Sequence, residues 1–301
     1  HLGCPNVSGM ASRGQLSKRL LFIVSEDYFF VSHRLYLAVA ASKAGYQVAV
    51  LCHVANHRQV IEKSGLQVFN WSLDRGSLNP LQELRTLFEV VYTIREFMPD
   101  LIHAVAIKPV IYSALACRIT MLKSRVYALV GLGYVFSAKT QKAKMIKPFL
   151  LVALRVLLIG KKTILILQNP DDLSVLLSNK IVNKKHVRLI RGAGVNTKLY
   201  FPQSPPAGRL PLVILPARML WDKGVGEFVE CASKVNKNSI KARFALVGAP
   251  DPHNPETISV GQLRTWNDQG IVEWWEYRED MPNVYQQASI VCLPSYREGL
   301  P

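Results

Sequence analysis

LLFIVSEDYFFVSHRLYLAVAASKAGYQVAVLC, residues 20–52, decides the fold class. Residues 20–25 are an apolar run of strand length, residues 32–44 carry apolar side chains at helical spacing, and residues 47–52 are a second apolar run. Gly45 is a favourable residue for ending the helix. Two nearly all-apolar strands joined by a helix are typical of a parallel sheet that helices cover on both faces.

The alternation of strands and helices continues to about residue 190. Strands are predicted at residues 65–71, 101–105, 125–130, 163–168 and 187–190, and helices at 80–97, 109–119 and 149–159 and from Pro170 onward. The helix at 80–97 is amphipathic, with a predicted apolar face made of Leu81, Leu84, Leu87, Phe88, Val91 and Ile94. The pattern predicts a doubly wound, Rossmann-like α/β domain at residues 18–195.

A second α/β pattern follows a turn-rich segment. Four prolines and one glycine fall within residues 201–211, and we place an interdomain linker at residues 196–210. Strands are predicted at residues 212–217, 243–247, 271–275 and 289–294, and helices at 224–234, 257–267 and 281–287. Residues 211–301 are therefore interpreted as the first part of a second Rossmann-like domain. A sheet of only four strands would leave an edge and an apolar face uncovered, so we expect this domain to be incomplete.

The composition excludes several classes of protein. Apolar residues make up 49% of the chain and charged residues 19%, which is typical of a globular protein and not of a disordered one. Residues 1–17 are small and polar, lack the apolar core of a signal peptide, and are predicted to be a disordered extension. The five cysteines are scattered without a Cys-x-x-Cys pair, which fits a reducing cytosol and suggests no zinc site.

The net charge of +16 predicts attraction to nucleic acid, an anionic membrane or phosphorylated substrates. Much of it lies in residues 101–170, which contain eleven Lys or Arg and no Asp or Glu. In that segment Lys139, Lys142, Lys144 and Lys147 precede the apolar helix at 149–159, which is too short to span a bilayer. We predict that the helix is buried in the core and that the four lysines face an anionic membrane.

Charged residues follow two predicted strands of the second domain. Arg218 and Lys223 come after the strand at 212–217 and before a helix, a place where α/β sheets bind ligands. Two cations beside a helix N-terminus suit a diphosphate, although incidental surface cations would give the same pattern. Glu298 follows the last strand beside a glycine-containing turn, where it would accept hydrogen bonds from sugar hydroxyls or cap a helix.

These residues, taken together, resemble a known family. Arg218 with Lys223-Gly224, followed by SYREGLP at residues 295–301, is similar to the retaining family-4 glycosyltransferases, which have two Rossmann-like domains in the GT-B arrangement. RGAGVNTKLYFP at residues 191–202 resembles the segment that precedes the second domain in that family. Residues 30–45, 131–136 and 168–172 resemble the subgroup that transfers sugars onto polyprenyl-diphosphate-linked acceptors.

The resemblance implies roles for individual residues. Arg218 and Lys223 would hold the donor diphosphate, and Glu298 would contact the donor sugar as the first glutamate of the family's Glu-x7-Glu motif. The second glutamate would stand at position 306, beyond the sequence. His103, in the strand at 101–105, would reach the transferred sugar from the first domain's side of the cleft. The alternative, which the residues favour without the resemblance, is that His103 is a half-buried histidine hydrogen-bonded to a backbone carbonyl.

Further candidates lie in loops of the first domain. Gly131 and Gly133 would line the donor or acceptor side, or form an ordinary turn. His33 and Arg34 at a helix start would contact an acceptor phosphate, whereas a solvated surface position is the alternative for Arg34. The carboxylates at 171 and 172 fit the first turn of a helix and not a metal site, so neither a metal nor a cofactor is expected.

The predicted function is transfer of a hexose or N-acetylhexosamine from a nucleoside-diphosphate sugar, preferably a UDP-sugar, to a lipid-linked saccharide in surface polysaccharide or glycan assembly. The resemblance implies a retaining, metal-independent enzyme on the cytoplasmic face of the membrane. A sugar-nucleotide epimerase of the same architecture and a non-enzymatic polyanion binder stay as alternatives. We expect no nucleic-acid partner, because no recognised motif accompanies the charge. The sequence gives no indication of oligomeric state.

Overall fold

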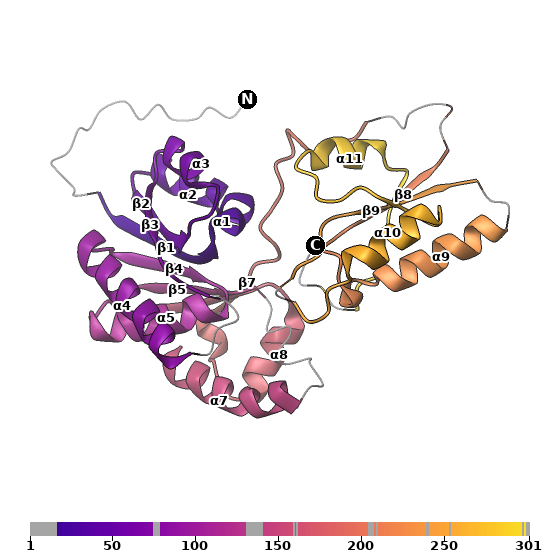
Figure 1. Cartoon of the computed structure of the whole chain (residues 1–301). Coiled ribbons are helices and arrows are strands. Elements are labelled where there is room, and N and C mark those ends of the chain that lie inside the picture. The colour runs from indigo at the N-terminus through magenta and orange to yellow at the C-terminus, as the bar shows by residue number, and fades with distance from the viewer. Residues whose placement is uncertain are drawn as a thin grey trace, which may run out of the picture. The chain divides into compact units, whose positions relative to one another are not determined.

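The computed structural model describes residues 17–74, 79–130, 141–158, 160, 162–203, 208, 210–238, 241–252, 254–296 and 298. The chain divides into two compact units, His1–Ala193 and Gly194–Pro301 (Figure 1). Each unit is built on its own parallel sheet. The predicted α/β class with two Rossmann-like sheets is therefore confirmed.

The first unit has a seven-stranded sheet in the order β3-β2-β1-β4-β5-β6-β7, and all its strand pairs are parallel. The strands are β1 Arg19–Glu26, β2 Gln47–His53, β3 Gln67–Asn70, β4 Leu101–Val105, β5 Arg125–Leu129, β6 Thr163–Leu167 and β7 Val187–Leu189. The order reverses between β1 and β4, as in other doubly wound sheets. The central strands carry apolar side chains on both faces of the sheet, because helices cover both faces.

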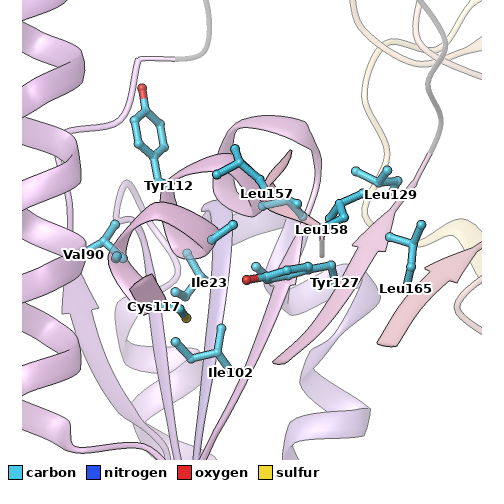
Figure 2. Packing of buried hydrophobic residues seen from close by; sticks show 14 of the residues in the cluster. Ile23, Val90, Ile102, Tyr112, Cys117, Tyr127, Leu129, Leu157, Leu158 and Leu165 are labelled. Carbon is cyan, nitrogen blue, oxygen red and sulfur yellow. The ribbon is translucent and has the colours of Figure 1, made fainter. Parts of the chain in front are cut away.

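Helices cover the two faces of this sheet (Figure 1). They are α1 Asp27–His33, α2 Leu35–Lys43, α3 Arg58–Lys63, α4 Pro80–Phe97, α5 Ile107–Ile119, α7 Gln141–Leu157 and α8 Pro170–Ser178, with a 3-10 turn at Lys184–His186. Side chains of α4, α5, α7 and α8 share one buried cluster, and side chains of α1, α2 and α3 share the other. Figure 2 shows Val90, Tyr112 and Leu157 of the first cluster around Ile23 and Ile102 of the sheet.

The ends of α4 match the prediction because three local signals agree. The Asn79 side chain accepts a hydrogen bond from the Leu81 N–H at 3.1 Å, and Pro80 occupies the first turn. Met98 ends the helix in the left-handed conformation at φ 49°. The prediction for its apolar face is confirmed for Leu87, Val91 and Ile94, which pack in the core. It was wrong for Leu81, Leu84 and Phe88, which are exposed.

The helix predicted at residues 32–44 is two helices in the structure. α1 begins at Asp27, before the predicted start, and α2 follows after a break at Arg34. Asp27 is buried at the start of α1, and its Oδ2 accepts the N–H groups of Ala55, Asn56 and His57 at 2.8–2.9 Å. This contact fixes the loop that leads into α3, a helix that the sequence analysis missed.

The second unit has a four-stranded parallel sheet in the order β10-β9-β8-β11. Its strands are β8 Leu212–Pro216, β9 Arg243–Val247, β10 Glu273–Trp274 and β11 Ile290–Val291, and its helices are α9 Val225–Lys237, α10 Val260–Asp268 and α11 Met281–Gln287, with a 3-10 turn at Trp221–Lys223. The helix α10 starts later than predicted because Ser259 caps it, while Thr257 pairs with Leu220 in an antiparallel bridge.

Candidate functional site

Three loops meet at the carboxyl end of the second unit's sheet. They follow the neighbouring strands β9, β8 and β11, and in a parallel sheet the carboxyl ends of adjacent strands lie side by side. The loop after β8 runs to Gly224, the loop after β9 begins at Gly248, and the loop after β11 contains residues 292–298. Ligands of open α/β sheets bind at this end.

Two glycines allow the loops to approach backbone to backbone. Gly248 has φ 152°, and a Cβ there would stand 1.9 Å from the Ala217 carbonyl oxygen. Gly224 has φ 72°, and its Cβ would stand 2.3 Å from the Pro294 carbonyl oxygen. Both positions therefore exclude a side chain, and they fix the loops after β9 and β11 against the loop after β8.

Each predicted diphosphate-binding cation is paired with a carboxylate from another loop. Lys223 Nζ lies 2.6 Å from Glu298 Oε1, and these side chains are 15% and 29% exposed. Arg218 Nη1 lies 2.7 Å from Asp251 Oδ2 in a more open position, with the Arg218 side chain 52% exposed. The sheet thus brings Arg218, Lys223 and Glu298 to one end, and it adds Asp251, which the sequence analysis missed.

The N-terminus of α9 lies at the same end of the sheet. Gly224 precedes α9, and no side chain caps the first turn. The Tyr296 hydroxyl donates a hydrogen bond to Glu227 in that turn, which lowers the pKa of the Glu227 carboxyl. The Tyr296 N–H also donates to the Asp222 carbonyl at 3.0 Å. Uncapped N–H groups beside two cations are a suitable arrangement for an anionic ligand.

A sequence signal for Asp251 existed. The run Gly248-Ala249-Pro250-Asp251 directly follows β9, and a glycine and an acid after an apolar strand mark the same kind of loop as Arg218 and Lys223 do after β8. Tyr296 gave no comparable signal, because its contact with Glu227 joins residues that are distant in the sequence.

His103 lies in the middle of β4, and the expectation that it is half-buried was wrong. It is 7% exposed and pairs in register with Phe22 of β1, whose ring it meets edge-on at a centroid distance of 5.2 Å. Its Nε2 has no hydrogen-bond partner among the described residues. Burial and, second, the charge of Arg34 lower the pKa of His103 to about 4, so its ring is neutral at pH 7.

Arg34 is buried, which contradicts the solvated alternative. It occupies the break between α1 and α2 and is 8% exposed. Its Nη1 donates to the His33 carbonyl at 2.9 Å, while its Nε has no partner among the described residues. It follows Phe30 by one helical turn, and Phe30 packs on Phe22 at 5.6 Å. Arg34 therefore belongs to the same face of the sheet as His103.

The other candidates divide into two groups. The His33 ring stacks on Phe29 at 4.6 Å and its Nδ1 lies 2.6 Å from Ser32 Oγ, on the exposed side of the α1–α2 break. Gly131, Gly133 and Lys139 lie outside the described residues. Lys142, Lys144 and Lys147 belong to α7, but their side chains are not among those described.

The predicted acidic first turn of α8 is confirmed. Asp171 and Asp172 occupy that turn, and the Asp172 N–H donates to the Asn169 side chain at 2.7 Å. In the described part of the chain, no group of three or more His, Cys, Asp or Glu is arranged to hold a metal ion. None of the described helices combines the length and hydropathy that crossing a bilayer requires.

Two doubly wound units are the architecture of the GT-B glycosyltransferases. Residues 19–169 match the family model described as "Glycosyl transferase 4-like", and residues 211–301 match that of "Glycosyl transferases group 1". The chain therefore belongs to the glycosyl transferase 4-like family and is a glycosyltransferase. The resemblance noted in the sequence is confirmed.

Several known proteins are similar over most of the chain. The N,N'-diacetylbacillosaminyl-diphospho-undecaprenol alpha-1,3-N-acetylgalactosaminyltransferase of Campylobacter jejuni is 28% identical over 267 residues, which are 85% of this chain and 68% of that protein. Sucrose-phosphate synthase from Thermosynechococcus elongatus shares the fold at a TM-score of 0.70 and 18% identity, covering 94% of this chain and 77% of its own. Anabaena HepE, solved with UDP and glucose, has a TM-score of 0.65 at 18% identity, covering 92% and 74%.

Proposed function

We propose that this glycosyltransferase moves a hexose or N-acetylhexosamine from a UDP-sugar to a lipid-linked saccharide acceptor in surface polysaccharide or glycan assembly. The observation that carries the proposal is the cluster at the carboxyl end of the second sheet, where Lys223 meets Glu298 at 2.6 Å and Arg218 meets Asp251 at 2.7 Å. The Campylobacter relative supports the acceptor class, because its name includes a diphospho-undecaprenol substrate.

The site chemistry follows from an exchange of anions. In this structure Glu298 and Asp251 neutralise the two cations. A donor diphosphate carries more charge than either carboxylate and presents several acceptor oxygens, so it would displace them from Lys223 and Arg218. The released Glu298 carboxylate would then accept hydrogen bonds from hydroxyls of the donor sugar. Binding the diphosphate would in this way place the sugar-binding group.

The same cations would act in the transition state. The departing nucleoside diphosphate gains negative charge as the bond to the sugar breaks. Lys223, Arg218 and the N–H groups of the α9 N-terminus are fixed donors that stabilise this charge without rearrangement. They would take the place of a metal ion, and we therefore propose metal-independent transfer. Retention at the anomeric carbon by front-face attack is part of the same proposal and rests on the family resemblance.

On the acceptor side we propose roles for His103, Arg34, His33, Gly131 and Gly133. Arg34 is a buried cation without an ion pair among the described residues, which suits an acceptor phosphate. His103 is neutral at pH 7 because of its lowered pKa, so it would offer the transferred sugar one hydrogen bond and no charge. The enzyme would work as a peripheral protein on the cytoplasmic face of the membrane, near its lipid-linked acceptor.

The test is transfer from a panel of radiolabelled nucleotide sugars to polyprenyl-diphosphate-linked saccharides, with the full-length protein and with a chelator present. We expect one UDP-sugar to be used, transfer to persist in the chelator, and proton NMR of the product to show the donor's anomeric configuration. Absence of transfer from every nucleotide sugar would refute the proposal. An inverted product or a requirement for metal would refute the retaining or metal-independent part alone.

A further inference from the structure

Three buried polar side chains come together at the amino end of the first unit's sheet. Thr163 is the first residue of β6, and it pairs in register with Arg125, the first residue of β5. Tyr127 lies two residues further along β5, so its side chain is on the same face of the sheet as that of Arg125. Thr163 Oγ1, Arg125 Nη1 and Tyr127 Oη are buried atoms without a hydrogen-bond partner among the described residues. We call these three residues the Thr163 cluster.

Two observations place the members of the Thr163 cluster close together. A Cβ added to Gly160, which lies between α7 and β6, would stand 2.6 Å from Thr163 Oγ1 and 2.8 Å from Arg125 Nη2. The hydroxyl and the guanidinium therefore border the same space beside Gly160. Burial raises the pKa of the Tyr127 hydroxyl, and the charge of Arg125 is near enough to oppose this rise. Figure 2 shows that the Tyr127 hydroxyl points towards Cys117 of α5.

The surrounding chain supplies no carboxylate to balance the charge of Arg125. Arg125 forms no ion pair among the described residues. Residues 101–170 contain no Asp or Glu, and the next acids, Asp171 and Asp172, lie in the first turn of α8, after the carboxyl end of β6. A guanidinium can only donate hydrogen bonds, and each hydroxyl can donate one. The Thr163 cluster is therefore a set of donors with a net positive charge.

Exposed lysines stand at the same end of the sheet. Lys123 comes two residues before β5 begins, Lys162 directly precedes β6, and Lys184 and Lys185 precede β7. The amino ends of neighbouring parallel strands lie side by side, so these cations raise the local concentration of anions. Arg125 itself is partly exposed, so an ion can reach the cluster from solvent.

We propose that the Thr163 cluster binds one small inorganic anion of the halide class, held by Arg125 Nη1, Thr163 Oγ1 and Tyr127 Oη. The anion accepts from all three donors and balances the guanidinium charge, whereas a water molecule would satisfy the donors and leave the charge unbalanced. The bound ion joins β5 to β6 and stabilises the first unit. Ligands of doubly wound sheets bind at the carboxyl ends of the strands, so this amino-end site goes beyond the proposed function and does not depend on it.

Thermal unfolding in matched salts tests the inference. The protein is unfolded in sodium chloride, in sodium bromide and in sodium gluconate at one ionic strength, so that screening of surface charges is the same in all three. The halides should raise the midpoint of unfolding above that in gluconate by about 3 °C or more, because an ion that binds only the folded chain stabilises it. Arg125→Met should abolish this difference.

The variant Thr163→Val keeps the shape of the side chain and removes one donor. In gluconate it should unfold at the parent's midpoint or above, since a buried hydroxyl without a partner is removed. In chloride it should unfold below the parent, because it loses most of the halide-dependent shift. The matched control is Thr86→Val: Thr86 is 1% exposed and Thr163 is 2% exposed, but the Thr86 hydroxyl already donates to the Gln82 carbonyl at 3.0 Å. Thr86→Val should lower the midpoint equally in every salt.

Crystals soaked in bromide locate the ion directly. We expect an anomalous peak in contact with Arg125 Nη1 and Thr163 Oγ1. A water molecule at that position in bromide, or a halide-dependent shift that is the same in Thr163→Val as in the parent, would overturn the inference. Sugar transfer is not a readout of either experiment. A halide site in a protein that transfers no sugar would therefore leave the inference standing and the proposed function refuted.

Discussion

Replacing Lys223 with methionine tests the central claim about the donor site. Methionine keeps most of the length of the side chain and removes its charge. Lys223 and Glu298 are partly buried, at 15% and 29% exposure, so the local dielectric is lower than that of water. Opposite unit charges about 4 Å apart at an effective dielectric constant of about 20 attract by roughly 4 kcal/mol. Part of this is offset when the diphosphate loses water and when Glu298 is displaced.

Removing one partner of a charge-assisted hydrogen bond costs a net binding free energy of about 1.5–3 kcal/mol. At about 1.4 kcal/mol per factor of ten, Lys223→Met should weaken UDP binding about 10- to 150-fold. Calorimetric titration of UDP measures this, and kcat/KM for the nucleotide sugar should fall at least as much. Lys234→Met is the matched control, because Lys234 also pairs with a glutamate at 2.6 Å but at 71% exposure on α9. It should leave UDP binding unchanged.

A double-mutant cycle separates contact from support. If Lys223 touches the diphosphate, Lys223→Met should still weaken UDP binding when Glu298 is already glutamine. If Lys223 only holds Glu298 in place, the double variant should bind UDP no more weakly than Glu298→Gln alone. The second result, or unchanged binding by Lys223→Met, would refute the assignment of Lys223 to the diphosphate.

Two further predictions concern backbone and burial. Gly224→Ala should lower the free energy of unfolding by about 2–4 kcal/mol in urea titration, since it adds a steric clash to the strain of a positive φ. The added Cβ would stand 2.3 Å from the Pro294 carbonyl oxygen. The control is Gly270→Ala, which has φ 68° and no atom within 4 Å of the added Cβ, so it should cost only the backbone strain. The pKa of His103 is lowered from 6.5 to about 4, so stability should fall as pH drops through this range. The loss is about 2 kcal/mol between pH 7 and pH 5, and it should be absent in His103→Phe; an equal pH dependence in both proteins would contradict the burial argument.

The strands were the most predictable part of the fold. β4 and β9 match their predicted bounds, because a strand covered on both faces is an uninterrupted apolar run between polar turns. α4 and α11 also match, with a proline in the first turn of each. α7 was predicted too short, because only the apolar run at 149–159 was assigned to it, whereas the helix begins at Gln141 and contains Pro148.

The site was predictable only where one loop carried its own signal. Arg218 and Lys223 follow a strand within a few residues, so position alone indicates the carboxyl end of the sheet. Their partners Asp251 and Glu298 come from other loops, and the pairing depends on the strand order β9-β8-β11, which a single sequence does not give. The burial of Arg34 was missed for the same reason, because it depends on how the break between α1 and α2 packs in the folded unit.

The two units of the chain carry their charged residues in different ways. The site cations Arg218 and Lys223 are each neutralised by a carboxylate, so they act on a ligand at contact distance and not through a long-range field. Most of the excess positive charge lies elsewhere, in residues 101–170, which contain eleven Lys or Arg and no Asp or Glu. A field of one sign attracts an extended anionic surface, whereas a paired cation selects a ligand that outcompetes its partner. This distribution supports the proposals that the first unit attracts an anionic membrane and that the second unit selects the donor.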